Sequence, residues 1–240
     1  MFETLLVRDG RPLELEAHLA RLDDSLRTLF GAPAPSTAPT RVLEHARGEE
    51  LARLRLTVAP DPDGTLVADV VVAPVDASLV FPSWDRGVEL APVVVVAGIG
   101  AHKWADRRLL AGLEADVAPA LPLLLDGDGT ALEASRGNLF VVHGETLVTP
   151  PADGRILPGI TRGRVVQLAD ALDIPVREEA IAFDSISTAT EVFLTGAVRG
   201  IEPVRACGGA IVESGERITA ALSRDLDLLW QGGAAHARVD

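Results

Sequence analysis

The chain has 240 residues, of which 48% are hydrophobic, and a net charge of −13 at pH 7. This composition predicts a folded protein with one large domain or two small ones, and it excludes a disordered chain. The acidic balance argues against nucleic acid and against an anionic membrane surface as partners.

Targeting and redox features are equally plain in the sequence. No apolar stretch is long enough to span a bilayer, and the N-terminal MFETLLVRDG lacks the basic and apolar regions of a signal peptide. The single cysteine, Cys207, cannot form an intramolecular disulfide and suits a reducing compartment. We therefore expect a cytoplasmic protein.

The first part of the chain predicts a mixture of strands and helices. In chain order we expect strands at 2–8 and 12–16, helices at 18–31 and 40–52, and strands at 52–60 and 65–74. Leucines repeat at helical spacing through the first helix, and Gly31 should end it. Asp9-Gly10 and the DPDG segment supply turns between strands.

The second part begins after an irregular segment at 75–87, which we expect to lead to a domain junction. In chain order we then expect a buried strand at 88–98, a helix at 107–121, hairpins at 121–135 and 138–151, a helix at 161–173, one or two strands at 191–209 and a helix at 215–231. This mixture predicts an α+β fold. We expect a small N-terminal α/β domain at 1–97 and a larger C-terminal domain at 98–240.

A single lysine, Lys103, lies in the stretch AHKWADRRLL at 101–110, although the chain has 22 lysine and arginine residues. An amine is a nucleophile only when it is deprotonated, which requires desolvation or a nearby cation to lower its pKa. Lys103 follows a predicted buried strand and precedes Arg107 and Arg108, and such surroundings would lower its pKa. The alternative is a surface lysine at the start of a helix.

Two glycine-containing turns could bind an anion. In LPGITRGRVV at 157–166, Gly159 allows close approach of the backbone, and Ile160 and Thr161 open a helix whose free N–H groups and dipole favour phosphate. The alternative is an ordinary turn into a helix with Thr161 as its cap. LTGAVRG at 194–200 is a second such turn after a strand.

Two charged residues could take part in the same chemistry. Glu133 ends a predicted strand five residues before Asn138, and a carboxylate there could hold a protonated ring nitrogen. The alternative is a solvated charge near a hairpin. Arg21, on an otherwise apolar helix face, could reach a phosphate, or its charged end could simply extend to solvent.

A lysine, a carboxylate, two phosphate-binding turns and an arginine are the parts of a pyridoxal-phosphate site. Their order resembles the class IV aminotransferase family (fold type IV), which includes branched-chain and D-amino-acid aminotransferases and 4-amino-4-deoxychorismate lyase. The matching segments are FET at 2–4, HLARLDDS at 18–25, HKWADR at 102–107, E-x4-NLF at 133–140, LPGITR at 157–162 and EVFLTGAVRGIEPV at 191–204. The resemblance covers nearly the whole chain.

The resemblance implies a D-amino-acid aminotransferase-like fold, with a β-barrel-like core in the larger domain, and pyridoxal 5'-phosphate as cofactor with no metal. Lys103 resembles the Schiff-base lysine that also moves the substrate proton, and Glu133 resembles the partner of the pyridine nitrogen. The other residues expected to bind the cofactor are Arg21, Asn138, Leu157, Gly159, Ile160, Thr161, Gly196 and Ala197. Family transaminases often have a threonine where Ala197 stands, so only its backbone donor is expected here.

The substrate implied by the resemblance is a small amino compound. The pattern K-x-x-[DN]-R, here Lys103 to Arg107, is similar to that of the lyases, as is VRG at 198–200. Arg107 and Arg199 could bind substrate carboxylates, or they could be structural. Trp104, bulky and next to the lysine, is expected to shape the substrate pocket. Family members build each active site at a subunit interface, so a homodimer is implied.

The sequence therefore favours an aminodeoxychorismate lyase of folate biosynthesis, giving 4-aminobenzoate and pyruvate. An aminotransferase acting on a branched-chain or D-amino acid is an alternative. The other alternative is a non-catalytic fold-type-IV binding protein, against which the presence of both Lys103 and Glu133 argues.

Overall fold

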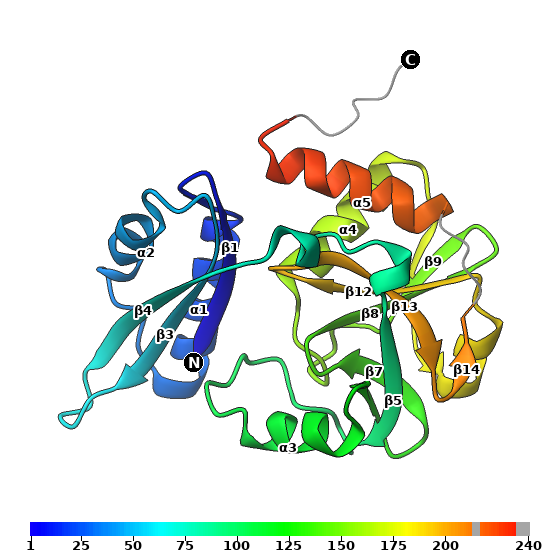
Figure 1. The fold of residues 1–240 in the computed structure, drawn as a ribbon. Coiled ribbons are helices and arrows are strands. Elements are labelled where there is room, and N and C mark those ends of the chain that lie inside the picture. Colours follow the sequence, from blue (N-terminus) through cyan, green and yellow to red (C-terminus); the bar gives the residue numbers. More distant parts are fainter. Residues whose placement is uncertain (213–216, 234–240) are drawn as a thin grey trace. The chain divides into compact units, whose positions relative to one another are not determined.

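The structure is a computed structural model that describes residues 1–212 and 217–233. The described chain forms two compact units. Unit 1 comprises Met1–Leu79 and His102–Asp106. Unit 2 comprises Val80–Ala101 and the described residues from Arg107 onward. Each unit has its own sheet (Figure 1) and its own apolar core.

Unit 1 is a four-stranded antiparallel sheet with two helices on one face. Its elements are β1 (Phe2–Arg8), β2 (Arg11–Pro12), α1 (Leu15–Phe30), α2 (Ala38–Ala46), β3 (Leu51–Pro60) and β4 (Leu66–Pro74), with strand order β2-β1-β3-β4. Alternate residues of β3, such as Leu54 and Leu56, pack against Leu22 and Leu26 of α1 in one apolar core.

Two expectations for this unit were wrong in detail. The strand expected at 12–16 is only the two-residue β2, because Glu14 takes a left-handed conformation (φ 52°) and α1 begins directly after it. The helix expected at 40–52 ends at Ala46, and the chain enters β3 at Leu51. The predicted end of the first helix is confirmed, since Gly31 caps α1 in the left-handed region.

Unit 2 is built on one large curled sheet. Its strands are β5 (Val88–Val94), β6 (Leu121–Leu125), β7 (Thr130–Ala134), β8 (Gly137–His143), β9 (Thr146–Thr149), β10 (Val176–Glu178), β11 (Ile181–Ala182), β12 (Glu191–Gly196), β13 (Gly200–Cys207) and β14 (Ala210–Ile211). Its α-helices are α3 (Arg108–Val117), α4 (Ile160–Ala171) and α5 (Arg217–Trp230), and short 3-10 turns lie at Trp84–Arg86 and Phe183–Thr188; a further 3-10 turn, at Ala77–Leu79, ends the first segment of unit 1.

Six of these strands close into a barrel. The order β8-β12-β13-β5-β6-β7 returns to β8 through the pairing of Glu133 with Asn138 and of Ala134 with Gly137. The expected α+β fold with a barrel-like core is thus confirmed. The division at 1–97 and 98–240 stays a prediction about domains, but β5, which it assigned to the N-terminal part, pairs with β6 and β13 in unit 2.

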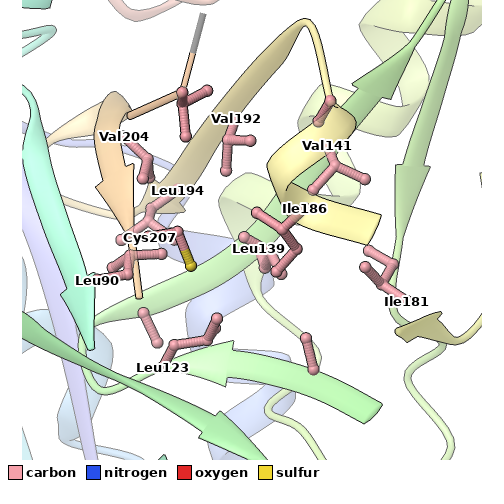
Figure 2. Packing of buried hydrophobic residues seen from close by; sticks show 14 of the residues in the cluster. Leu90, Leu123, Leu139, Val141, Ile181, Ile186, Val192, Leu194, Val204 and Cys207 are labelled. Carbon is pink, nitrogen blue, oxygen red and sulfur yellow. The ribbon is translucent and has the colours of Figure 1, made fainter. Parts of the chain in front are cut away.

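The barrel interior is apolar. Figure 2 shows Leu90, Leu123, Leu139 and Leu194 pointing toward one another from four different strands, with the Cys207 thiol among them. Burial raises the pKa of this thiol to about 11. The expectation that residues 88–98 form a buried strand was wrong, because β5 buries only Leu90 and leaves Val94 exposed.

Helices α4 and α5 cover part of the outer surface of the barrel and contact each other (Figure 1). The outer face beneath them includes the stacked rings of Phe140 and Phe193, with centroids 5.0 Å apart. The buried carboxylate of Glu191 accepts the N–H groups of Ile218 (3.0 Å) and Thr219 (2.7 Å) and so caps α5. The predicted start of this helix at 215–216 lies outside the described residues. Across the described part of the chain, helices that are both long and apolar enough to cross a membrane are absent.

Candidate active site

Glu133 and Asn138 form the centre of a polar network at one end of the barrel. They pair across β7 and β8, and both are buried. The Asn138 Nδ2 group donates to Glu133 Oε2 (3.0 Å), and the backbone N–H of Leu157 donates to Glu133 Oε1 (3.1 Å). Glu133 is therefore a fixed, buried carboxylate and not a solvated charge near a hairpin.

The same network fixes the entrance to α4. Asn138 Nδ2 also donates to the carbonyl oxygen of Leu157 (2.8 Å). A Cβ on Gly159 would lie 2.0 Å from Asn138 Oδ1, so only glycine fits where the backbone crosses this side chain. Leu157 and Gly159 are thus tied directly to the Glu133 network.

Helix α4 presents its N-terminus next to this network. Gly159 is the N-cap and makes no side-chain cap, so the interpretation of Thr161 as the capping residue was wrong. Ile160 and Thr161 occupy the first turn, where N–H groups lack partners within the helix, and the dipole favours an anion. The local geometry therefore suits the phosphate group for which these residues were predicted.

The second predicted turn connects β12 to β13 through Ala197, Val198 and Arg199, with Gly196 paired to Gly200. It lies beside the turn between β7 and β8, because a Cβ on Gly196 would lie 3.5 Å from the carbonyl oxygen of Arg136. The two turns thus share the end of the barrel at which Glu133 and Asn138 lie.

Arginine and glutamate side chains form a network around these turns. Arg107 donates to the carbonyl oxygen of Ser135 (2.9 Å) and lies 3.7 Å from Glu114, which also pairs with Arg136 (3.3 Å). Arg199 Nη1 donates to Glu202 Oε1 at 2.6 Å. Burial raises the pKa of Glu202, although the charges of Arg199 and Arg136 act in the opposite direction. Arg107 and Arg199, which the sequence proposed as carboxylate ligands, thus already have protein partners.

Lys103 belongs to unit 1 and lies in an irregular segment, five residues before α3 begins. Its carbonyl oxygen accepts the N–H of Phe2 (3.0 Å), and its Nζ lies 5.0 Å from the centre of the Phe2 ring. The Arg55 guanidinium lies 4.0 Å from the centre of the same ring. Lys103 is therefore half-buried on an aromatic side chain and does not start a helix.

Arg21 also lies in unit 1, where it binds a buried carboxylate. Its guanidinium donates two hydrogen bonds to Glu3, at 2.9 and 2.6 Å, and His18 Nδ1 lies 2.8 Å from the same carboxylate. Burial alone would raise the pKa of Glu3, but His18 and Arg21 outweigh it and lower this pKa to about 2. Arg21 is thus oriented by an ionic contact with Glu3. The alternative, in which its charged end simply extends to solvent, was wrong.

Trp104 is the most exposed of the predicted substrate residues, with 47% of its surface accessible. Its ring meets the edge of His102, whose Nδ1 is 3.0 Å from Ser25 Oγ. The segment around Lys103 is therefore attached to α1 of the same unit.

The residues of the two units divide as follows. Unit 1 holds Arg21, Lys103 and Trp104; unit 2 brings together Glu133, Asn138, Leu157, Gly159, Ile160 and Thr161, with Gly196, Ala197, Arg199 and Arg107 on or beside the neighbouring turns. A phosphorylated pyridine requires a carboxylate to accept the ring N–H and free N–H donors for the phosphate, so Glu133 and the N-terminus of α4 in unit 2 fit pyridoxal 5'-phosphate.

Several residues of this site escaped the sequence analysis. Glu3 had a usable signal, because a carboxylate within the apolar strand FETLLVR must find partners when buried. Glu202 had a local signal, because it lies three residues after Arg199. Glu114 and Arg136 had none, since their contact joins segments far apart in the chain.

Comparison with known proteins agrees with this geometry. Residues 1–207 match the family model of class IV amino-transferases. A probable branched-chain-amino-acid aminotransferase from Thermotoga maritima is 30% identical over 213 residues, which are 85% of this chain and 76% of the relative. The structure of 4-amino-4-deoxychorismate lyase from Pseudomonas aeruginosa matches with a TM-score of 0.76 and 27% identity, over 97% of this chain and 90% of that one. The PLP-bound form of a hypothetical aminotransferase from Mycobacterium tuberculosis matches with a TM-score of 0.83 and 23% identity, over 95% and 87% of the two chains, which shows a common fold.

The chain belongs to the class IV aminotransferase family. This membership confirms the resemblance drawn from the sequence, the expectation of an enzyme, and pyridoxal 5'-phosphate as the cofactor.

Proposed function

We propose that this protein is a 4-amino-4-deoxychorismate lyase, which releases pyruvate and leaves 4-aminobenzoate. The observation that carries the proposal is the arginine network of unit 2, in which Arg107, Arg136 and Arg199 surround the two turns beside Glu133. Three guanidinium groups lie there with the carboxylates of Glu114 and Glu202, and the charge of the third carboxylate, Glu133, would be matched by the protonated pyridine nitrogen, so a positive charge remains for the substrate. A substrate with two carboxylates, as aminodeoxychorismate has, matches that charge.

The cofactor-binding roles follow from the contacts of each residue. Glu133, fixed by Asn138 and the Leu157 N–H, would hold the protonated pyridine nitrogen. The N–H groups of Ile160, Thr161 and Ala197 would bind the phosphate, together with Arg21 oriented by Glu3. When bound, pyridoxal phosphate supplies an electron sink for the negative charge that develops on the substrate carbon bearing the amine.

Lys103 has the role of proton carrier in this proposal. Its amine would take the proton from the substrate carbon bearing the amine, as a positioned general base. The Phe2 ring and the backbone contact between Phe2 and Lys103 limit the positions that this amine can take. Arg107 and Arg199 would orient the substrate carboxylates, and Trp104 would restrict the substrates that approach Lys103.

The test is formation of 4-aminobenzoate and pyruvate from aminodeoxychorismate by the cofactor-loaded protein, with Lys103→Arg as the control variant. A guanidinium stays protonated at neutral pH, so we expect this variant to fold normally and to lose turnover by at least about a thousandfold. Circular dichroism checks the fold. Equal product formation by both proteins would contradict the role of Lys103.

A second candidate is an aminotransferase that acts on a branched-chain amino acid. It is favoured by the 30% identity to the Thermotoga maritima relative over most of the chain. The same preparation distinguishes the two. Transfer of an amino group from leucine or valine to 2-oxoglutarate, without 4-aminobenzoate formation, would replace the lyase proposal, whereas a protein that binds no cofactor would favour the non-catalytic alternative.

We also propose that the protein is a cytoplasmic homodimer. Val94, Val96 and Leu109 of unit 2 are each more than half exposed, which suits burial against a second copy. The single buried cysteine suits a reducing compartment. Light scattering after gel filtration tests the dimer, and a monomer at micromolar concentration would contradict it.

A further inference from the structure

We propose that Phe81 is a positioning residue that holds the turn between β12 and β13 in its anion-binding shape. This inference rests on the proposed function, in which that turn supplies the Ala197 N–H and the Arg199 side chain. The backbone N–H of Phe81 donates to the carbonyl oxygen of Arg199 (2.9 Å), although the two residues are far apart in sequence.

Gly200 is the point at which the ring of Phe81 meets the turn. Gly200 has a left-handed backbone (φ 67°), which glycine adopts most readily. A Cβ at this position would also lie 2.3 Å from Cε1 of Phe81. Gly200 therefore satisfies two separate requirements, and the second exists only because the Phe81 ring lies against it.

Phe81 itself is held in an unusual conformation. Its φ of 49° is costly for a bulky side chain, so surrounding contacts must maintain it. One of these is Trp230 of α5, whose ring centre lies 5.1 Å from that of Phe81 at an angle of 53° between the planes. Trp230 is buried, so the end of α5 anchors Phe81, and Phe81 anchors the turn.

Arg199 is consequently fixed at both ends. Phe81 binds its carbonyl oxygen, and Glu202 binds its guanidinium. A turn that is already ordered before the ligand arrives binds without the entropic cost of ordering it. Phe81 thus contributes to the affinity for the phosphate and the substrate carboxylate without touching either.

The chain contains a matched control for this arrangement. In the turn between β13 and β14, Gly208 also has a left-handed backbone (φ 59°), and a Cβ there would lie 2.7 Å from Cζ of Phe183. Phe183 packs against the apolar interior of the same unit, and its turn has no role in the proposed function. A Phe→Leu change at 183 therefore removes an equivalent ring from an equivalent glycine.

The experiment compares Phe81→Leu, Phe183→Leu and the conservative Phe81→Tyr with the wild type, all as full-length proteins loaded with cofactor. For Phe81→Leu we expect the KM of the substrate and the Kd of pyridoxal 5'-phosphate for the apoprotein to rise about tenfold, which corresponds to ~1.4 kcal/mol, while kcat changes by less than about twofold. Phe81→Tyr keeps the ring and should restore both constants. Phe183→Leu should leave both unchanged.

Amide hydrogen exchange at 197–200 gives a readout that does not depend on the cofactor or on turnover. We expect faster exchange there in Phe81→Leu than in the wild type or in Phe183→Leu. Equal exchange at 197–200 in all three proteins would overturn the inference, as would equal KM and Kd in the two leucine variants. If the wild type binds no cofactor, the proposed function fails, whereas faster exchange in Phe81→Leu still supports the role of Phe81 in holding the turn between β12 and β13. If Phe81→Leu does not fold, Phe81→Met takes its place.

Discussion

Each unit of this protein contains a buried carboxylate at the centre of a polar network, but the two carboxylates have different partners. In unit 1, Glu3 lies between the side chains of His18 and Arg21, and its pKa falls to about 2. In unit 2, Glu133 accepts hydrogen bonds from the Asn138 amide and the Leu157 N–H, and it interacts electrostatically with Arg107. Both carboxylates are almost inaccessible to solvent.

The difference indicates which carboxylate serves structure and which serves the cofactor. Glu3 forms its ion pair with Arg21 within the protein, and its contacts with Arg21 and His18 join β1 to α1. The Asn138 amide and the Leu157 N–H fix the orientation of Glu133, whose negative charge can stabilise a cation that enters the site, such as a protonated pyridine. A buried carboxylate held by neutral donors next to a helix N-terminus is therefore the more informative feature of an active site.

The largest effect should come from Glu133→Gln. The change keeps the shape of the side chain but removes the charge opposite the pyridine nitrogen, so we expect kcat to fall about 10²–10³-fold with little change in the unfolding midpoint. Turnover and the absorbance spectrum of the bound cofactor measure the effect.

Glu191→Gln is the matched control for that experiment. Glu191 is equally buried and also accepts two N–H groups, but both come from the backbone of the first turn of α5. Loss of its charge should lower stability by about 1 kcal/mol and leave kcat unchanged. Similar losses of activity in both variants would remove the special role of Glu133.

The second-largest effect should come from Glu3→Gln, which should lower the stability of the protein. Removal of the Glu3 charge breaks a buried ion pair with Arg21, so we expect the free energy of unfolding at pH 7 to fall by about 3 kcal/mol. Urea unfolding measures it. The folded variant should retain more activity than Glu133→Gln, because only the orientation of Arg21 changes. A loss below about 1 kcal/mol would show that the three residues are not coupled.

The pH dependence sharpens the same test. The pKa of Glu3 is lower in the folded chain (about 2) than in an unfolded one (about 4.3). The contribution of its charge to the free energy of unfolding is therefore complete when the pH is above the unfolded pKa, and it is lost as the pH falls toward 2. The shift corresponds to about 3 kcal/mol. The stability difference between wild type and Glu3→Gln should therefore shrink between pH 5 and pH 2, and a constant difference would contradict the ionic origin.

Many of the helices and strands, and part of the candidate site, could be predicted from local sequence. Apolar periodicity predicted α1 and the paired strands β3 and β4, because each buries one face. The residues Glu133 and Asn138 lie five positions apart across a tight turn, so a short motif was enough to indicate that they act together. The two glycine-containing turns were visible for the same reason.

The remaining features depend on tertiary contacts that local sequence does not specify. The alternation in PLELE predicted a strand, but the left-handed backbone at Glu14 starts α1 there. The run of valines after Leu90 predicted a buried strand, but one face of β5 lies on the outside of the barrel and leaves Val94 exposed. The pairing of Glu3 with Arg21 joins a strand to a helix across 18 positions, a separation at which no motif operates.

The smallest of the three effects should come from Gly159→Ala, which tests how Glu133 is held. The new Cβ would lie 2.0 Å from Asn138 Oδ1, so Asn138 must move away from its contacts with Glu133 and with Leu157. We expect a loss of about 1–2 kcal/mol in stability and a similar loss in cofactor affinity. Gly163→Ala, in the same helix with open space around it, should instead stabilise the protein by about 0.5–1 kcal/mol.

Asn138→Ala combined with Gly159→Ala should then cost less stability than the sum of the single changes, because the clash disappears with the amide. Simple additivity would mean that Gly159 acts through the backbone of α4 and not through Asn138.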